Sequence, residues 1–437
     1  MIILGISQGF HDAAVCYIKN GEILHASHSE RYSKIKGDKH IHNDQYLQHF
    51  YTKTAYYEKP FYKNLRRISI GQSWQSTKIQ YDQAFNHHKS HAAAGYYTAP
   101  FDDCNIIVND AIGEWDTISI WDNMKKIKSW KYPYSLGLLY SAITKNIGLK
   151  PNEEEYITMG MAAYGEPIHN LEPYLEQNNH FGINKLTGRK EDLATSVQAL
   201  FEKKLLELVD MCPKNNIILM GGCGLNCVAN SKIKRKNIWI MPNPGDAGSS
   251  LGAAALMYGK KLNWRGPYLG YNINKKINPK DVVKELLKNK ICGIANGKAE
   301  FGPRALGNRS LIADPRINSI KDKVNEVKYR DKFRPFAPAI LEEHANDYFE
   351  GPMNEYMQFI AKAKHDYLSV THVDGTARVQ VVKEDCQSII RPILEEWYNK
   401  TGCPMLLNTS LNIKGQPIVN DENDAIKFME RSGIHVF

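Results

Sequence analysis

Long hydrophobic runs and clustered cysteines are both missing from this chain. No stretch of about 18 or more consecutive apolar residues occurs, which excludes a predicted membrane-spanning helix. The eight cysteines are scattered without a C-x-x-C pair, so no disulfide framework is predicted. Residues 1–6 predict a strand and lack the basic start and small-residue cleavage site of a signal peptide. Together these absences predict a cytoplasmic protein with no membrane partner.

A strong charge bias is also absent. The net charge of +9 is modest for 437 residues, so the composition permits acidic partners, including nucleic acid, without predicting them. No internal repeat or low-complexity tract is visible. Hydrophobic residues make up 43% of the chain and charged residues 24%, which is typical of a globular protein, and the length predicts two or three domains.

Turn and strand signals predict an α/β fold. Two short apolar runs flank Asn20-Gly21, the favoured residue pair for a type I′ hairpin turn. A strand, a polar turn over residues 7–12 and then such a hairpin are how actin-like ATPases and sugar kinases begin. Further elements follow from apolar periodicity. We expect strands at 104–108, 216–220 and 291–295, and helices at 193–211, 248–258 and 279–289.

The pattern breaks between residues 261 and 274, where Gly266, Pro267 and Gly270 fall close together. Such a stretch is typical of a linker between domains. We therefore predict two domains, covering residues 1–267 and 268–437.

Two histidines and two aspartates form a candidate metal site in the first domain. His87 and His91 are four residues apart in a helix-compatible run, so both imidazoles would share one helix face. An isolated pair of this kind is weak, and surface histidines are the ordinary interpretation. Asp110 follows a predicted strand, however, and Asp246 lies in a turn that opens a helix. This mixed nitrogen and oxygen set suits Fe(II), Mn(II) or Zn(II) rather than calcium.

Two glycine-rich turns indicate a nucleotide cleft between two lobes. The first, residues 221–226, follows a strand and includes the candidate residues Gly221, Gly222 and Asn226. The second, residues 245–252, includes Gly245 and Gly248 at a helix start. Backbone N–H groups in such turns can bind phosphate, although structural turns also need glycine.

Residues 300–310 place Arg304 and Arg309 in a frame of glycines and a proline. Glycine permits close backbone approach to a ligand, and arginine offers a planar fork of donors for phosphate or carboxylate. More basic residues follow downstream: Lys328, Arg330, Lys332 and Arg334. A solvated basic face is the ordinary interpretation, but the interleaved glycine, proline and phenylalanine residues, Phe333 among them, favour a pocket for a small anion.

Blocks of residues along essentially the whole chain resemble the O-carbamoyltransferase family of NodU and CmcH type. They are residues 5–14, 29–34, 87–93, 159–166, 300–310, 333–338, 371–380 and 407–412. The resemblance implies an N-terminal actin-like ATPase (ASKHA) domain related to the tRNA threonylcarbamoyl transferases. It also implies a YrdC-like α/β domain at the C-terminus.

In this family the second domain converts carbamoyl phosphate and ATP, with Mg²⁺, to carbamoyl adenylate. The first domain then transfers the carbamoyl group to an acceptor hydroxyl beside an iron ion. Carried over by position, the metal ligands are His87, His91, Asp110 and Asp246. The carbamoyl phosphate and adenylate pocket is lined by Arg304, Lys328, Arg334, Arg378 and Ser410.

The acceptor hydroxyl needs a base, and His11 beside Asp12 in the first turn is our candidate, with a structural histidine as the other interpretation. Lys328 and Arg334 are expected to act on the phosphate oxygens during adenylate formation. Two other functions stay open. One is carbamoyl or threonylcarbamoyl transfer to tRNA or a hydroxylated DNA base, although no basic stripe with interleaved aromatics supports it. The other is a non-catalytic nucleotide- or metal-binding module. The sequence does not define the oligomeric state.

Overall fold

The computed structural model describes residues 1–437 except 78, 178, 180–181, 185, 235 and 332–333. Its chain divides into two compact units. The first unit comprises Met1–Ser29 and Gly37–Trp264, and the second comprises Glu30–Lys36 and Arg265–Phe437. Lys332 and Phe333 of the predicted basic segment therefore lie outside the described residues.

The first unit begins with a five-stranded sheet in the order β3-β2-β1-β4-β5. Strands β1 to β3 are antiparallel neighbours, while β4 and β5 continue the sheet in parallel with β1. Asn20 and Gly21 have φ of 52° and 86°, which confirms the predicted hairpin turn. The strands are β1 (Ile2–Ser7), β2 (Ala14–Lys19), β3 (Glu22–His28), β4 (Lys53–Tyr56) and β5 (Gln83–Ala84).

A second sheet in the same unit repeats this topology. Its order, β8-β7-β6-β9-β10, again has three antiparallel strands followed by two parallel ones. This duplicated sheet is the hallmark of actin-like ATPases and confirms the predicted fold class, although no repeat is visible in the sequence. The strands are β6 (Asn105–Asn109), β7 (Asp116–Asp122), β8 (Lys125–Lys131), β9 (Asn216–Met220) and β10 (Asn237–Trp239).

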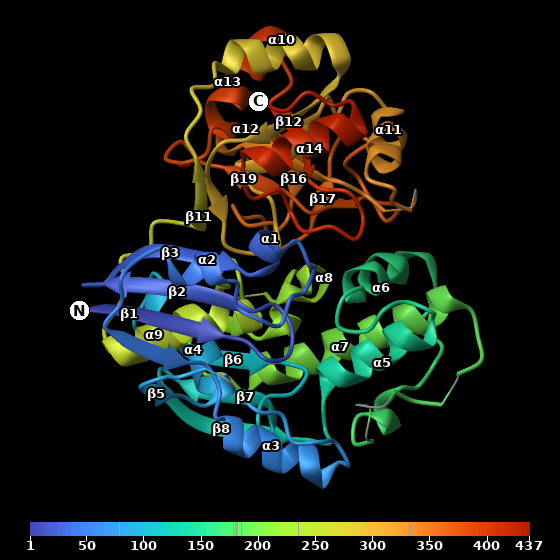
Figure 1. Cartoon of the computed structure of the whole chain (residues 1–437). Helices are drawn as coiled ribbons and strands as arrows, with labels where there is room; N and C mark the ends of the chain where they lie inside the picture. Colours follow the sequence, from blue (N-terminus) through green and yellow to red (C-terminus); the bar gives the residue numbers. More distant parts are fainter. Residues whose placement is uncertain (78, 178, 180–181, 185, 235, 332–333) are drawn as a thin grey trace. The chain divides into compact units, whose positions relative to one another are not determined.

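Helices α4 (His87–Thr98) and α9 (Ser249–Tyr258) pack together between the two sheets (Figure 1). Helix α9 contacts β1 and β2, and α4 contacts β6 and β9. Their close approach depends on small residues, because a Cβ on Gly252 would lie 1.8 Å from the Ser90 carbonyl oxygen. The remaining helices of this unit are α2 (Asn43–Tyr46), α3 (Pro60–Ser69), α5 (Leu136–Asn146), α6 (Glu155–Met161), α7 (Lys190–Asp210) and α8 (Cys227–Asn230).

The second unit is built on a mixed sheet of order β12-β14-β20-β15-β19. An antiparallel pair of strands (β11, β13) and a small three-stranded sheet (β16, β17, β18) accompany it. The strands are β11 (Tyr268–Ile273), β12 (Ile291–Ala295), β13 (Gly297–Glu300), β14 (Arg309–Ala313), β15 (Ala337–Leu341), β16 (Phe349–Glu350), β17 (Ala361–Ala363), β18 (Thr376–Ala377), β19 (Gln380–Val382) and β20 (Met405–Ser410). The helices are α1 (Glu30–Ser33), α10 (Pro279–Asn289), α11 (Ile320–Val327), α12 (Glu342–Tyr348), α13 (Ile390–Thr401) and α14 (Glu422–Ser432).

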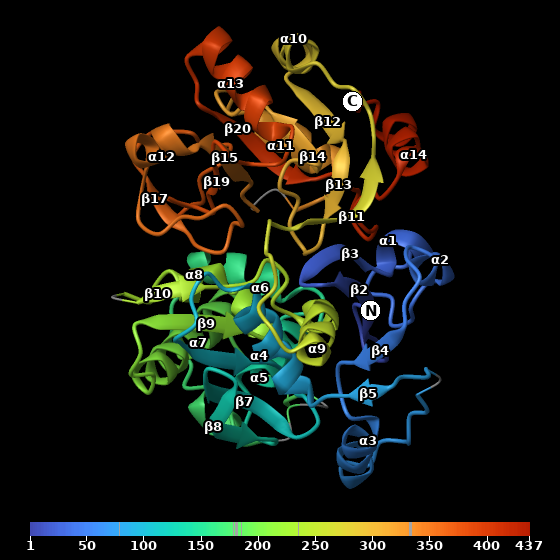
Figure 2. The same cartoon turned by 90° about the vertical axis from the view of Figure 1, so that its left-hand side faces the viewer.

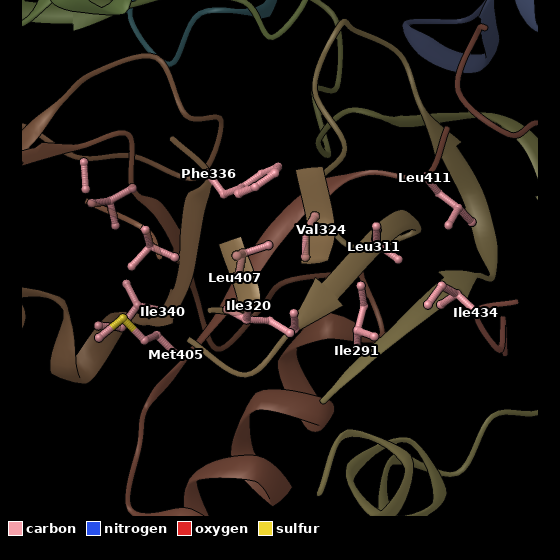
Figure 3. Close-up of a cluster of buried hydrophobic side chains, with 14 of the residues drawn as sticks. Ile291, Leu311, Ile320, Val324, Phe336, Ile340, Met405, Leu407, Leu411 and Ile434 are labelled. Atoms are coloured by element: carbon pink, nitrogen blue, oxygen red, sulfur yellow. The ribbon is translucent and has the colours of Figure 1, made fainter. Parts of the chain in front are cut away.

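Both faces of this sheet are covered by apolar side chains. Because successive strand residues point to opposite faces, Leu407 joins one core cluster while Leu406 joins the other. The cluster that contains Leu407 also takes in Val324 of α11 (Figure 3). The opposite cluster includes Trp397 of α13 and residues of α10. Figure 2 shows these two helices beside the sheet. This burial on both sides fixes the positions of the loops that follow the strands.

The predicted helices and strands are present, within a few residues at their ends. The predicted linker over residues 261–274 is wrong in its second half, because β11 occupies Tyr268–Ile273 and pairs with β13. The nearby Gly266 and Pro267 obscured this strand in the sequence. All eight cysteines are free thiols. Within the described part of the chain, no helix combines the length and apolar character needed to cross a bilayer.

Candidate functional site

The four predicted metal ligands converge in the interior of the first unit. Their ligand atoms all lie within 4.8 Å of one another, and all four residues are buried. His87 and His91 lie one turn apart on α4, with their Nε2 atoms 3.1 Å from each other. Asp110 directly follows β6, and Asp246 begins a 3-10 turn (Asp246–Gly248) that leads into α9.

The distances between these atoms fit a single ion. His87 Nε2 lies 3.0 Å from Asp110 Oδ2 and 3.4 Å from Asp246 Oδ1. His91 Nε2 lies 3.9 Å and 3.2 Å from the same two oxygens. Ligands bound at roughly 2.0–2.2 Å to one metal stand about 3–4 Å apart. The residues therefore fit a divalent ion, although their role as metal ligands stays a prediction.

Neighbouring groups orient the ligands. His91 Nδ1 lies 3.0 Å from the Pro244 carbonyl oxygen, which favours a proton on Nδ1 and leaves the Nε2 lone pair facing the cluster. The Gly222 N–H donates to Asp110 Oδ1 at 3.1 Å, so Oδ2 points to the histidines. At the start of α4, the His87 N–H donates to the Glu114 carboxylate at 3.0 Å. Partners of this kind are typical of metal sites.

Without an ion, the charged groups of the cluster shift the pKa values of His87, Asp110 and Asp246. Burial raises the pKa of Asp110, but hydrogen bonding and charge from the two histidines outweigh it and bring the pKa to about 2. Burial also raises the pKa of Asp246. Charge and hydrogen bonds from His87 and His91 more than offset burial and hold this pKa well below its usual range. Burial lowers the pKa of His87, yet Asp246 and Asp110 raise it well above the ordinary value. The metal-free site thus holds cationic imidazole against two carboxylates.

The predicted base lies in the first turn, between β1 and β2. His11 Nδ1 lies 2.8 Å from Asp12 Oδ2, and both side chains are partly exposed. Burial lowers the pKa of His11, but the hydrogen bond and charge of Asp12, with Asp246 and Asp110, raise it to about 9. The first turn lies near the cluster, because Phe10, which precedes His11, lines the same pocket as His87 and Asp246. Its role as a base stays a prediction.

The two glycine-rich turns, residues 221–226 and 245–252, help to position the residues of the cluster. Gly221 has φ of 88°, and a Cβ there would lie 2.2 Å from the Asn109 carbonyl oxygen. Its N–H donates to Pro244, and the Gly248 N–H donates to Gly245. The Asn226 side chain caps α8 and bonds to Gln198. These donors already have internal acceptors, so nucleotide binding by Gly221, Gly222, Asn226, Gly245 and Gly248 stays a prediction.

A small pocket, partly open to solvent, adjoins the cluster at His87 and Asp246. Its other lining residues come from the first turn, from the β4–α3 segment and from the turn before β7. They are Phe10, Tyr57, Glu58, Lys63, Arg66, Arg67, Ile112 and Gly113. These residues were not predicted from the sequence. The pattern that could have indicated them is a helix that begins with Pro60 soon after a strand and carries basic residues three and four positions apart.

In the second unit, Lys328 and Ser410 are brought together. Lys328 Nζ is buried and donates to the Ser410 carbonyl oxygen, and to the carbonyl and Oδ1 of Asn412 at 3.0 and 2.9 Å. Burial, with Arg330 and Arg334 nearby, holds the pKa of Lys328 well below its usual range. Its hydrogen bonds thus organise the loop after β20. Direct contact with phosphate stays a prediction for Lys328.

The expectation that Arg309 helps to form the anion pocket is wrong. Its guanidinium is fully buried and makes six hydrogen bonds to five backbone carbonyls of this unit. Arg304, Arg334 and Arg378 are partly exposed. The sequence pattern does not separate the two roles, because an arginine that binds backbone carbonyls and one that binds a ligand can have the same flanking glycines.

Glu300 shapes the loop that carries Arg304. Its Oε1 accepts hydrogen bonds from the backbone N–H groups of Leu306, Asn308 and Arg309 at 2.7, 2.9 and 3.3 Å. A buried carboxylate that binds three N–H groups fixes the local backbone strongly. The loop is therefore preformed, whereas the contacts of Arg304, Arg334, Arg378 and Ser410 with a substrate stay predictions.

Comparison with known proteins defines the class. Residues 283–437 match the family described as Carbamoyltransferase C-terminus, and residues 46–186 and 174–255 match Carbamoyltransferase N-terminus. The chain is 30% identical to uncharacterized protein sll1178 of Synechocystis sp., over 98% of this chain and 94% of that protein. It is 28% identical to nodulation protein NolNO of Sinorhizobium fredii, over 98% and 80% of the respective chains.

Among solved structures, the activator of the 2-hydroxyisocaproyl-CoA dehydratase from Clostridium difficile aligns with a TM-score of 0.41 and 14% identity. That alignment covers 59% of this chain and 95% of the activator. The family matches confirm the predicted resemblance: this chain belongs to the carbamoyltransferase family and is a transferase.

Proposed function

We propose that the protein is an ATP-dependent O-carbamoyltransferase. In the second unit, for which we retain the predicted YrdC-like assignment, water releases inorganic phosphate from carbamoyl phosphate. An oxygen of the resulting carbamate then bonds to the α-phosphorus of ATP, and pyrophosphate leaves, which gives carbamoyl adenylate. The carbamoyl group is then transferred to a hydroxyl group at the metal cluster of the first unit. The observation that carries this proposal is the convergence of His87, His91, Asp110 and Asp246 in a chain of the carbamoyltransferase family.

The second unit supports the adenylation half by its preformed cationic loop. Carbamoyl phosphate, carbamate and ATP are all anionic and their oxygens crowd together during adenylate formation, so fixed positive charge must surround them. Glu300 holds the loop that presents Arg304, while Lys328 holds the loop that presents Ser410. In this scheme Arg304, Arg334 and Arg378 bind the anionic oxygens of the reactants. Lys328 contributes positive charge next to the loop that it holds.

In the transfer half, the acceptor oxygen bonds to the carbamoyl carbon. The bond between that carbon and the phosphate oxygen breaks, and AMP leaves. His11 accepts the proton of the acceptor hydroxyl at its Nε2, while the hydrogen bond from Nδ1 to Asp12 fixes the tautomer. Fe(II), or another divalent ion, would supply Lewis acidity to a carbonyl oxygen and compensate the carboxylates that raise the His11 pKa.

The test combines protein, carbamoyl phosphate, ATP, Mg²⁺ and ferrous iron, and measures pyrophosphate and carbamoylated nucleotide. Both products are expected, and Arg304→Ala should abolish them. The exposed Arg189→Gln is the matched control and should leave them unchanged. Absence of pyrophosphate with the wild-type protein would refute the adenylation step. A panel of hydroxylated compounds, tRNA included, then identifies the acceptor by its mass increase.

A further inference from the structure

Arg66 on α3 is a buried arginine whose charge is not satisfied by the protein. Only 4% of the residue is exposed, and its Nε and Nη1 have no hydrogen-bond partner. It also makes no ion pair within 4.0 Å among the residues that the structure describes. Burying unpaired donors of a charged group is costly, so such an arginine calls for an anionic partner. Arg66 lines the pocket beside the metal cluster.

The carboxylates nearest to Arg66 are engaged elsewhere. Glu58 accepts a hydrogen bond from Lys63 Nζ at 2.7 Å, and both side chains are buried. Glu114 accepts from the backbone N–H groups of Lys59 and His87 at 2.9 and 3.0 Å. Burial lowers the pKa of Arg66, and the charges of Glu58 and Glu114 offset this in part. Neither carboxylate, however, forms a hydrogen-bonded pair with the guanidinium.

Arg309 shows what a purely structural buried arginine looks like in this same chain. Its guanidinium donates six hydrogen bonds to backbone carbonyl oxygens. Arg66 has the same burial without those acceptors. The difference indicates that the partner of Arg66 comes from a bound molecule.

We propose that the pocket lined by Lys63, Arg66 and Arg67 is an oxyanion subsite, with Arg66 as its anchor. The pocket also includes His87 and Asp246, so a phosphate or carboxylate held there lies next to the reacting group. A guanidinium fork suits either oxyanion. Because the identity of the reactants rests on the proposed function, the group has two sources. It belongs to the acceptor, which would then be a hydroxylated anion, or to the carbamoyl adenylate phosphate.

The other two basic residues of the pocket each use a donor on a protein partner. Lys63 Nζ is paired with Glu58, and Arg67 Nε donates to the Ser73 carbonyl oxygen at 3.0 Å. Both hydrogen bonds hold positive charge at the pocket wall. Arg66 is the member with unused buried N–H groups, so its removal should weaken anion binding more than removal of either neighbour.

The direct test uses tungstate, an electron-dense analogue of phosphate, soaked into crystals of the whole protein. We expect an anomalous peak within hydrogen-bonding distance of Arg66, which disappears in Arg66→Gln and persists in Arg189→Gln. In solution, Arg66→Gln should weaken tungstate binding at this site about tenfold or more. Arg66→Lys, which keeps the charge but loses the fork, should give an intermediate affinity. A peak in the second unit with none at Arg66 would overturn the subsite.

Two kinetic arms identify the source of the anion, with far-UV circular dichroism as the check on folding. If the acceptor carries it, Arg66→Gln raises the KM for the acceptor and leaves AMP binding unchanged. If the adenylate carries it, the same variant weakens AMP binding. Unchanged values in both arms would refute a role in substrate binding. Tungstate binding does not depend on carbamoyl transfer, so failure of the proposed function leaves the subsite separately testable.

Discussion

Binding of a divalent ion should stabilise the first unit, and the effect should depend on His91 but not on His88. Both are buried on α4, and they are three residues apart in the sequence. His91 Nε2 faces the cluster, whereas His88 Nδ1 lies 2.7 Å from Ser119 Oγ on β7, outside the ligand set. His88 is therefore a matched control for the loss of a buried imidazole.

The magnitude follows from mass action. An ion present at 100 times its dissociation constant stabilises the folded state by about 2.7 kcal/mol. For a unit of roughly 250 residues, each kcal/mol raises Tm by about 2–4 °C, which predicts an increase of about 5–11 °C. The ion competes with protons on the cluster imidazoles, since carboxylates raise the pKa of His87. The increase should therefore diminish as the pH is lowered.

The assay is differential scanning calorimetry with and without Mn(II) or anaerobic Fe(II). His91→Ala should lose the metal-dependent increase in Tm. His88→Ala should have a lower starting Tm, because it creates a cavity, yet keep the increase. An equal increase in both variants, or none in the wild-type protein, would refute the four-residue site.

Three further predictions address the two units. Arg309→Met should destabilise the second unit by about 3–5 kcal/mol in urea unfolding, because it leaves buried carbonyls without donors. Arg304→Ala should cost less than about 1 kcal/mol. Equal costs would contradict the assigned roles. Gly252→Ala should destabilise the first unit by about 1–3 kcal/mol or more, since its Cβ would meet the Ser90 carbonyl at 1.8 Å, and an unchanged Tm would contradict that packing. The depressed folded-state pKa of Asp110, about 2, gives stability that is present above about pH 4 and lost as the pH falls towards 2. Metal-free Asp110→Asn should therefore show a shallower loss of stability in acid, measured by urea titration at each pH.

The sequence predicted local elements well, because short-range chemistry defines them. A type I′ turn requires positive φ values, which Asn20 and Gly21 tolerate. The i, i+4 spacing of His87 and His91 places both on one helix face. The duplicated sheet topology was not predicted, since strand order depends on contacts between residues that are remote in sequence. The strand Tyr268–Ile273 was hidden by the glycine and proline that precede it.

The sites show a similar division. The convergence of four ligands was foreseeable because each is a metal-binding residue type at a strand end, a turn or a helix face. Whether an arginine binds a ligand or a backbone was not foreseeable. Arg309 and Arg66 have opposite hydrogen-bonding states, which depend on carbonyls and carboxylates supplied by distant segments.

In the proposed function, adenylate formation and carbamoyl transfer use separate sites. One rapid-quench measurement tests it most directly, following radiolabelled carbamoyl phosphate through pyrophosphate release, carbamoyl adenylate and carbamoylated acceptor in wild type and His91→Ala. We predict that His91→Ala releases pyrophosphate at the wild-type rate, accumulates carbamoyl adenylate and carbamoylates no acceptor. Loss of pyrophosphate release together with transfer, or full transfer by His91→Ala, would contradict the account.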